Sequence, residues 1–574
     1  MDSDLWRRFK SIWVCDTEFV ALPGERPRPV CLVAKEFRTG EVVRIWADDM
    51  ASVKAAPFPT GRDALFVAYY ASAEFSVFLK NGWPLPVHVL DLYAEFRVQT
   101  NGKQTDFGRG LIGAMSYFGL KPMEVEDKDS NRALIMGGGP WTEAERLRIL
   151  DYCQADVEGT VDLLARMAPT IDLARAVGLR GRYAKALACM EQTGVPVDVP
   201  TLERIKAGWV SIQSRLIEDV ARVVPVYEGR TFKEHSFSAW LAGQGVAWPR
   251  LESGRLMLDR DTFRQMARAH SGVALLHELR ESLSQLRLGG LPVGSDGRNR
   301  VLLSPYGSKT GRNQPSNSRF IFGTATWLRS LITPPPGRFV AYVDWTSQEI
   351  GIAAKLADDA NLLAAYEDDP YLWFAKRVGA VPADATKKCH KAQRDLYKAT
   401  MLGVGYGMGE RSLAMRIGQP EAKARSLLIQ HRETFPDLWR WMQGAIDHAL
   451  LTGRIVARFG WALHVCDDPN PRSLQNWPVQ SNAAEMMRLA ACMLTEAGID
   501  VCCPVHDAFL VEGPADSVDE IVELTQNVMA EASALTLDGF RLRSDAKIVM
   551  PGERYHDERG QGFFERIIRI IEES

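Results

Sequence analysis

The stretch "YVDWTSQEI", residues 342–350, contains two carboxylates, Asp344 and Glu349, where an apolar strand pattern runs into a helix. A second strand pattern, "CCPVHDAFLVEG", contains Asp507 between two apolar halves. Burying an ionised carboxylate is costly unless it is paired or binds a cation. Each Asp alone is compatible with a capped turn or an Arg partner. If the two strands are neighbours, the carboxylates converge, which is typical of Mg²⁺ sites that support in-line phosphoryl displacement.

A basic helix is predicted between these two strands. In "CHKAQRDLYKATMLGVGYGMG" four residues recur every four positions and therefore lie on one face: Arg394, Lys398, Leu402 and Tyr406. On one helix face, the planar guanidinium of Arg can bind two phosphate oxygens and the ammonium of Lys adds a compact positive charge, so the pair suits a polyphosphate. A solvated amphipathic helix would give the same pattern, but the position between two acidic strands favours a nucleotide site.

A second array has the same period on a later helix and consists of Arg472, Asn476 and Gln480. Such donors suit the DNA minor groove, where every base pair presents acceptors, so they could test duplex geometry without reading sequence. Polar residues are common on helix surfaces, so the array by itself is weak evidence.

The whole sequence has 574 residues, which is more than one hydrophobic core usually serves, so we expect two to four domains. A net charge of −3 argues against a protein that coats nucleic acid by bulk charge, but it leaves room for a local basic cleft. The nine cysteines form no CxxC pair, which fits a reducing cytoplasm. The N-terminus lacks a signal-peptide run, and the most apolar long stretch contains Glu74, so we expect no membrane span.

Strand-like alternation covers residues 11–46, and helical periodicity follows at 142–167, where Thr142 and Glu145 predict an N-terminal capping box. A mostly helical stretch and a Gly/Ser/Asn/Pro-rich segment near residue 300 come next. The expected fold class is α/β plus α+β, with units at 1–168, 169–298 and 299–574.

The third unit resembles the polymerase region of family A DNA polymerases, the bacterial DNA polymerase I type. Asp344 and Glu349 have the spacing of the family's first motif, with "DWTSQEI" in place of the commoner "DYSQIEL". The fingers pattern RxxxKxxxxxxxYG is matched by Arg394, Lys398, Tyr406 and Gly407, and the third motif by His506 and Asp507. In "TGRNQPSN", Arg312 matches a duplex-contacting Arg, and "ALACMEQTGVPVD" is similar to the stretch that opens the thumb.

This resemblance implies a right-hand fold with a thumb at 169–298 and a palm with fingers at 299–574, the fingers covering about 360–450. Asp344 and Asp507 would hold two Mg²⁺ ions, with Mn²⁺ able to substitute. The implied nucleotide-binding residues are Arg394, Lys398, Leu402, Tyr406, His506 and Glu349, the last as a steric gate against ribose. The implied duplex contacts are Arg312, Arg472, Asn476 and Gln480.

The first unit resembles the family's RNase H-like 3′–5′ exonuclease. Asp16 and Glu18 in "CDTE" match its DxE motif, and Tyr152 with Asp156 match its YxxxD motif. The resemblance makes Asp16, Glu18 and Asp156 the ligands of a second pair of Mg²⁺ ions. The family's middle motif reads Asn, three residues, Asp. Its best counterpart here is "YASAE", which makes Glu74 the candidate, with Asp91 in "VLDLYAEF" as the alternative.

Two positions of the polymerase motifs depart from the family. Ala508 stands where the third motif usually ends in Glu, so this position is not expected to be an essential ligand. Leu402 stands where Phe or Tyr is usual, and we expect it to discriminate against dideoxynucleotides as Phe does.

The expected activity is template-directed DNA synthesis in replication, with dNTPs and primer-template DNA as partners and proofreading of single-stranded 3′ ends. No 5′ nuclease is expected, because the sequence begins almost at Asp16. A processivity or replisome factor stays open, and the compact arrangement is more typical of a phage, which would place the protein in the host cytoplasm. A single-subunit RNA polymerase would share the palm acids, but Glu349 argues against it. An exonuclease with a DNA-binding-only polymerase half would have no need of Asp344, Lys398 and Asp507 together.

Overall fold

The computed structural model of the chain describes residues 4–121, 125–267, 270–285, 291–466 and 469–573. The chain divides into two compact units. The first contains residues 1–194, 302–314 and 340–548, and the second contains residues 195–301, 315–339 and 549–574. Contiguous ranges such as those expected from the sequence cannot describe these units, because the chain leaves each unit and returns to it.

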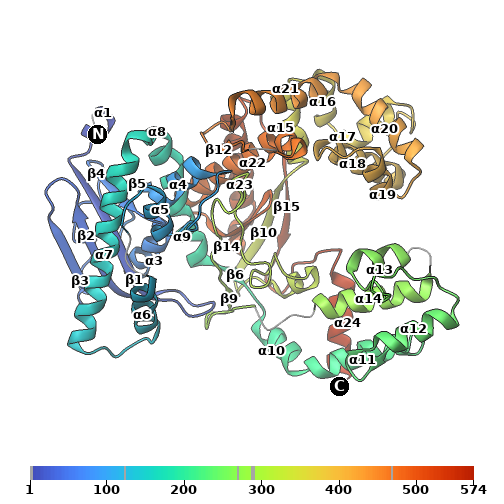
Figure 1. Cartoon of the computed structure of the whole chain (residues 1–574), viewed down its shortest axis with the longest axis horizontal. Coiled ribbons are helices and arrows are strands. Elements are labelled where there is room, and N and C mark those ends of the chain that lie inside the picture. Colours follow the sequence, from blue (N-terminus) through green and yellow to red (C-terminus); the bar gives the residue numbers. More distant parts are fainter. Residues whose placement is uncertain (1–3, 122–124, 268–269, 286–290, 467–468, 574) are drawn as a thin grey trace. The chain divides into compact units, whose positions relative to one another are not determined.

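A five-stranded mixed sheet forms the N-terminal part of the first unit (Figure 1), in the order β3-β2-β1-β4-β5. Its strands are β1 (Ser11–Val20), β2 (Arg28–Glu36), β3 (Val42–Trp46), β4 (Ala64–Ala68) and β5 (His88–Asp91). The first three pair antiparallel, whereas β4 runs parallel to both β1 and β5. The strand pattern predicted for residues 11–46 is therefore confirmed.

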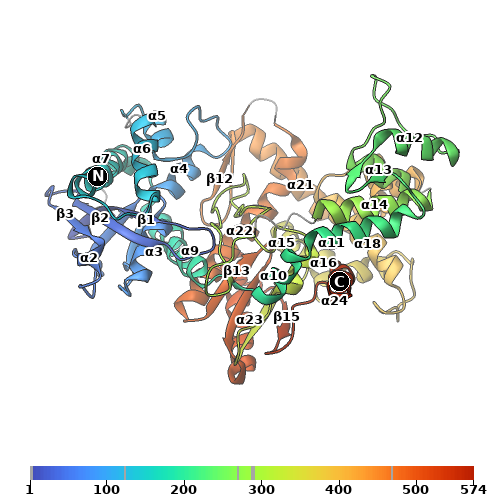
Figure 2. The ribbon, with the colours of Figure 1, turned by 90° about the horizontal axis from the view of Figure 1, so that it is seen from below.

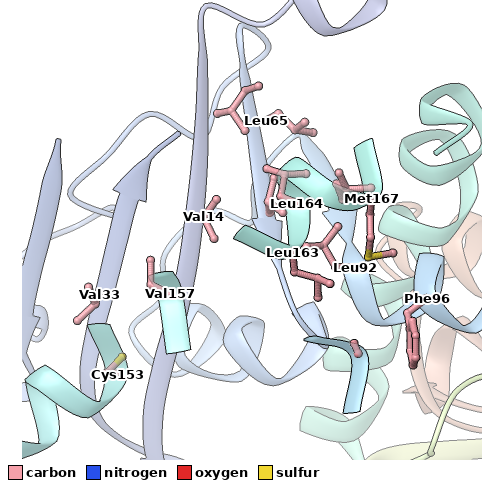
Figure 3. Close-up of a cluster of buried hydrophobic side chains, with 14 of the residues drawn as sticks. Val14, Val33, Leu65, Leu92, Phe96, Cys153, Val157, Leu163, Leu164 and Met167 are labelled. Carbon is pink, nitrogen blue, oxygen red and sulfur yellow. The ribbon is translucent and has the colours of Figure 1, made fainter. Parts of the chain in front are cut away.

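Helices cover both faces of this sheet (Figure 2), with α7 (Glu143–Met167) on one side and α3 (Ala71–Lys80) on the other. Successive side chains of β1 alternate between the faces. Val14 packs with Val157 and Leu164 of α7 (Figure 3), whereas Trp13 packs with Phe75 of α3. The remaining helices here are α1 (Asp4–Arg7), α2 (Ala47–Met50), α4 (Leu92–Thr100), α5 (Leu111–Tyr117), α6 (Val125–Met136), α8 (Leu173–Arg175) and α9 (Arg182–Thr193).

The N-terminus of α7 shows that local sequence positions this helix. The hydroxyl of Thr142 accepts the N–H of Glu145 over 3.3 Å, and the Glu145 carboxylate accepts the N–H of Thr142 over 2.8 Å. This is the predicted capping box, which satisfies backbone donors that a helix start leaves without partners. It sets the phase of the helix that carries Tyr152 and Asp156.

A four-stranded sheet forms the C-terminal part of the first unit, in the order β13-β14-β10-β15. Its strands are β10 (Arg338–Trp345), β13 (Asp500–Val505), β14 (Ala508–Pro514) and β15 (Ser544–Val549). Two long helices, α22 (Pro471–Glu496) and α23 (Val518–Thr536), pack on each other and on its strands. The two acidic strand patterns of the sequence thus belong to one sheet.

Seven helices follow β10 and share a core that includes Phe374, Tyr397 and Phe435. They are α15 (Gln348–Ala357), α16 (Ala360–Tyr366), α17 (Pro370–Arg377), α18 (Lys391–Gly405), α19 (Glu410–Ile417), α20 (Glu421–Thr434) and α21 (Pro436–Thr452). A hairpin of β11 (Arg454–Val456) and β12 (Ala462–His464) leads from them to α22.

The second unit is mainly helical. Its helices are α10 (Val199–Ala207), α11 (Trp209–Ala221), α12 (Glu234–Gly243), α13 (Arg260–Ala267), α14 (Ser271–Gln285) and α24 (Gln561–Glu572), and its short strand pairs are β6 (Val195–Pro196) with β9 (Arg298–Asn299) and β7 (Tyr227–Glu228) with β8 (Thr231–Phe232). The C-terminal α24 packs against α11, and Arg329 pairs with Asp557 over 2.7 Å. Within the described ranges, no helix combines the length and apolarity needed to cross a membrane.

Candidate active sites

Asp344 and Asp507 lie side by side in the C-terminal sheet of the first unit. Asp344 is near the end of β10, and Asp507 follows β13 in the turn before β14. The N–H of Trp345 donates to the carbonyl of Asp507 over 3.1 Å, which ties the two backbones together. The turn needs a left-handed residue, and His506 adopts a φ of +53° there.

The carboxylate pair has the properties of a cation site. Burial, and then the negative charge of Asp507, raise the pKa of Asp344 to about 8. Asp344 Oδ1 is buried and finds no hydrogen-bond partner among the described residues. Because a buried carboxylate oxygen without a partner is costly, a divalent cation with oxygen preference fits this pair.

The stripe predicted on α18 brings its two cations to one aromatic ring. The Arg394 guanidinium carbon lies 5.1 Å, and the Lys398 Nζ 5.6 Å, from the centre of the Tyr371 ring. Arg394 Nε also donates to Asp369 Oδ2 over 2.5 Å. The positive charge of Lys398 is close enough to Asp344 to oppose the rise of its pKa. Tyr371 and Asp369 thus hold the two cationic side chains, and Lys398 lies near the carboxylate pair.

Glu349 lies in the first turn of α15 and connects two other predicted site residues. Its Oε1 accepts from Arg312 Nη2 and from the hydroxyl of Tyr406, each over 3.2 Å. Glu349 and Leu402 also line one pocket, together with His431. Leu402 is half-buried and packs against the core of the surrounding helices. The structure thus brings the predicted gate and the atypical Leu402 to the same pocket.

The predicted array on α22 lies next to this pocket. Asn476 is 8% exposed and lines the pocket, and its Nδ2 finds no partner among the described residues. Gln480 lies close enough to the Tyr406 hydroxyl to hydrogen-bond with it. Gly407 has a φ of +66°, and a Cβ there would lie 3.0 Å from Arg472 Cγ. Close packing of the end of α18 on α22 therefore requires a glycine at this motif position.

A second group of carboxylates lies between β1 and α7. Asp16 and Glu18 are two positions apart on β1 and therefore face α7, which carries Tyr152, Cys153 and Asp156. One ligand atom from each of Asp16, Glu18 and Cys153 lies within 4.8 Å of the others. Burial, and then the charge of Asp156, raise the pKa of Asp16 to about 8, and burial followed by the charge of Asp16 raises the pKa of Glu18.

The donor set of this second group favours a hard cation. Cys153 Sγ donates to Asp16 Oδ2 over 3.4 Å, and burial raises the pKa of its thiol, so it stays protonated and is a poor ligand. The carboxylate oxygens of Asp16, Glu18 and Asp156 remain, and these fit Mg²⁺. Lys128 Nζ lies 3.3 Å from Asp156 Oδ2 and supplies a cation at the edge of the group.

Glu74 lies near this group. It is 3% exposed and accepts the Thr17 hydroxyl over 2.5 Å. Thr17 faces α3, on the opposite side of β1 from Asp16. Burial, and then the charge of Asp16, raise the pKa of Glu74, so the two carboxylates are still electrostatic neighbours. The alternative candidate, Asp91, caps α4 by accepting the N–H of Tyr93 over 2.9 Å, and it also accepts the N–H of Tyr70 over 3.0 Å.

Four residues that lie at these sites are not part of any motif recognised in the sequence: Lys128, Asp369, Tyr371 and Asp545. Asp369 is the N-cap of α17, a position that the Asp-Pro pair of "EDDPYLWF" signals, but its bond to Arg394 is not encoded locally. Asp545 on β15 accepts the Thr346 hydroxyl over 3.1 Å, and its charge adds to the raised pKa of Asp344. No pattern around Lys128 or Asp545 predicts these contacts, because both depend on which elements pack together.

Comparisons with known proteins agree with the geometry. The family model described as DNA polymerase family A matches residues 319–549, which contain both palm aspartates, Glu349 and the α18 stripe. The DNA polymerase of Mycobacterium phage D29 is 22% identical over 413 residues, or 68% of this chain and 66% of that protein. The thermostable DNA polymerase I of Thermus caldophilus is 24% identical over 386 residues, or 62% of this chain and 45% of that polymerase. The chain thus matches less than half the length of the thermostable relative.

A solved structure shares the fold of almost the whole chain. It is the POL domain of Pol1 from M. smegmatis in complex with DNA primer-template and dNTP, with a TM-score of 0.72 and 18% identity over 95% of this chain and 97% of that one. The chain therefore has the right-hand fold of a polymerase domain. Together with the family match, this confirms the resemblance seen in the sequence: residues 319–549 are similar to DNA polymerase family A, and the fold is that of a family A polymerase domain.

Proposed function

We propose that the chain is a template-directed DNA polymerase that extends primer 3′ ends with dNTPs. The observation that carries this proposal is the buried pair Asp344 and Asp507 beside Lys398, with one carboxylate oxygen left without a partner among the described residues. The similarity of the chain to the DNA polymerases of Mycobacterium phage D29 and Thermus caldophilus supports the same reaction. Primer-template DNA and dNTPs, which are present with the M. smegmatis domain, are the proposed partners.

Asp344 and Asp507 would hold two Mg²⁺ ions, for which Mn²⁺ could substitute, and the bound ions would supply charge stabilisation to the attacking and leaving oxygens. Arg394 and Lys398 bind the triphosphate, and their contacts with Tyr371 hold them in place before the nucleotide arrives. Arg312, Arg472, Asn476 and Gln480 contact the duplex. His506 lies beside Asp507 in the exposed turn, next to the reacting groups.

Glu349 selects the sugar. Its carboxylate is fixed by Arg312 and Tyr406, so it cannot swing away from a 2′-hydroxyl without breaking two hydrogen bonds. A fixed side chain against C2′ rejects ribose by clash and by leaving the hydroxyl unpaired. This specificity separates the proposed DNA polymerase from a single-subunit RNA polymerase.

We further propose a 3′–5′ proofreading exonuclease of RNase H-like architecture in the N-terminal part. Asp16, Glu18 and Asp156 would hold a second pair of Mg²⁺ ions, and Tyr152 lies beside them on α7. The mixed sheet with an antiparallel β1–β3 meander and parallel β4 and β5 supports this architecture. Glu74 is the candidate for the middle motif, on the strength of its position after β4 and its charge coupling to Asp16.

A primer-extension assay tests the polymerase proposal. The chain is incubated with a 5′-labelled primer-template and either dNTPs or rNTPs, with Mg²⁺ or with EDTA. We expect extension with dNTPs and Mg²⁺, and shortening of the primer when nucleotides are left out. Extension with rNTPs at an equal rate would support the RNA polymerase alternative, and shortening without any extension would support the exonuclease whose polymerase half only binds DNA.

A further inference from the structure

The segment 302–314, which carries Arg312, is held by one face of α4. Tyr93, Arg97 and Asn101 are four residues apart and therefore lie in a row along this helix and its C-cap. They donate to three carbonyls of the segment, which follow the same order along the chain. Tyr93 reaches Pro305 O over 3.2 Å, Arg97 reaches Tyr306 O over 3.0 and 3.2 Å, and Asn101 reaches Lys309 O over 2.8 Å.

The contact at Lys309 is unusually dense. Its carbonyl accepts Asn101 Nδ2 and also the indole N–H groups of Trp461 and Trp477, over 3.1 and 2.9 Å. A carbonyl oxygen has two lone pairs, so three converging donors exceed what an ordinary turn provides. Asn101 is 1% exposed, and the same Nδ2 donates to Ala462 O over 2.7 Å. Asn101 thus joins α4, the segment and the β11–β12 hairpin.

The constraint continues from Lys309 to Arg312. Gly311 has a φ of +81°, and a Cβ there would lie 2.9 Å from the Trp461 ring. Arg488 Nη1 donates to Gly311 O over 2.7 Å, and the N–H of Arg312 donates to Ser308 Oγ over 2.9 Å. The Lys309 and Gly311 carbonyls and the N–H of Arg312 are therefore held, and from this backbone the Arg312 side chain reaches Glu349 Oε1 over 3.2 Å.

We propose that Asn101 of α4 is a positioning residue for Arg312, so that the N-terminal α/β part supports duplex binding by the polymerase apart from any chemistry of its own. The inference rests on the proposed function, in which Arg312 contacts the primer-template. It assigns a second task to a part of the chain whose sequence motifs point only to an exonuclease.

Equilibrium binding of a fluorescent primer-template, without nucleotide, tests the proposal in the full-length chain. Asn101→Ala should raise the Kd about tenfold, because loss of two buried hydrogen bonds frees the Lys309 carbonyl to shift. In extension assays the primer-template KM should rise with it, while kcat stays within about twofold. Thr100→Ala is the matched control, since Thr100 is 1% exposed on the same helix and its hydroxyl donates to Phe96 O within α4.

A double-mutant cycle with Arg312→Ala separates positioning from general destabilisation. If Asn101 acts through Arg312, the double variant should bind no more weakly than Arg312→Ala alone. Additive losses, an unchanged Kd for Asn101→Ala, or an unchanged Kd for Arg312→Ala would each overturn the proposal. If Asn101→Ala does not fold, Tyr93→Phe, which removes one hydroxyl, takes its place and should show a smaller but equally non-additive loss. Absence of extension by the wild-type chain would contradict the proposed function, whereas the binding cycle needs no catalysis.

Discussion

Glu349 is the residue on which sugar selection depends in the proposed site. Glu349→Ala should raise incorporation of rNTPs relative to dNTPs about tenfold or more, because truncation removes both the clash and the cost of an unpaired hydroxyl. Competition between each rNTP and its dNTP on one primer-template measures the ratio. Glu349→Gln keeps the size of the side chain and should change the ratio much less. An equal ratio for the Ala variant and the wild type would place the gate at another residue.

His431 makes the stability of the α20 region sensitive to acid. It is 1% exposed and accepts Trp439 Nε1 over 3.1 Å, and burial lowers its pKa to about 3. Above pH 6.5 the imidazole is neutral in both the folded and the unfolded state. As the pH falls below 6.5, only the unfolded state takes up the proton, so folding stability is lost progressively down to about pH 3.

Replacing this histidine should therefore remove part of the acid sensitivity. Relative to wild type, His431→Gln should gain about 2 kcal/mol between pH 7 and pH 5, whatever its stability at neutral pH. Denaturant unfolding at the two pH values measures the gain. His448→Gln, at an exposed histidine on α21, is the control and should show no such gain. A pH-independent difference for His431→Gln would mean that the buried imidazole takes up its proton in the folded state.

At the scale of single residues, the sequence was sufficient where the spacing along one element determines proximity. Asp16 and Glu18 share a strand face, and Thr142 with Glu145 form the predicted capping box. The sequence was insufficient where the contacts of a residue depend on how distant elements pack together. The motif spacing that makes Glu74 a candidate does not reveal its hydrogen bond with Thr17 on the α3 side of β1. The partners of Asn101 are more than two hundred residues away in the chain, so no local pattern could reveal them.

The helix α18 is the element that carries most of the proposed nucleotide-binding residues. Arg394 and Lys398 share one face of the helix, as the four-residue repeat predicted. Both contact Tyr371, and Leu402 lines the same pocket as Glu349. Lys398→Ala should raise the KM for dNTPs about tenfold or more, since it removes a charge-assisted contact to the triphosphate. Primer-template Kd should change little. Lys423→Ala, an exposed lysine on α20, is the control, and an equal effect of both variants would indicate only bulk charge.

The type of each element was readable because apolar periodicity differs between strands and helices. The strands of residues 11–46, the helix after Thr142 and the basic helix were all predicted and found. The sequence did not predict that β10 lies next to β14 in one sheet. More than 150 residues separate β10 from β14, so their pairing depends on tertiary packing. The same holds for β15, which brings Asp545 near Asp344.

For the whole molecule, the two proposed activities should be separable. Asp16→Ala should abolish degradation of single-stranded and mismatched 3′ ends, because loss of one shared ligand dismantles a two-metal site. Extension of a matched primer should survive, since Asp16 lies in the N-terminal sheet and Asp344 in the C-terminal one. Degradation by Asp16→Ala would contradict the exonuclease assignment.

The same assay with Glu74→Ala tests whether Glu74 is the residue of the middle motif. Unchanged degradation by this variant would show that Glu74 is not a metal ligand.

Each compact unit of the molecule is built from segments that are far apart in the sequence. The segments 302–314 and 340–548 return to the unit of residues 1–194, whereas 549–574 joins the mainly helical unit. Such returns depend on contacts between distant segments, such as that between α24 and α11, which composition and periodicity do not encode. The expected boundary between residues 298 and 299 rests on composition and on the family resemblance, and it stays a prediction.

Single-turnover extension of a matched primer-template by Asp344→Ala and Asp507→Ala tests whether these two aspartates hold the catalytic ions. Both variants should lose extension with Mg²⁺, because each removes a carboxylate from the proposed metal pair. Their primer-template Kd should stay within about twofold of wild type, since duplex affinity comes mainly from phosphate contacts spread over many residues. Extension by either variant at a rate near that of the wild type would contradict the assignment of Asp344 and Asp507 as the catalytic metal ligands.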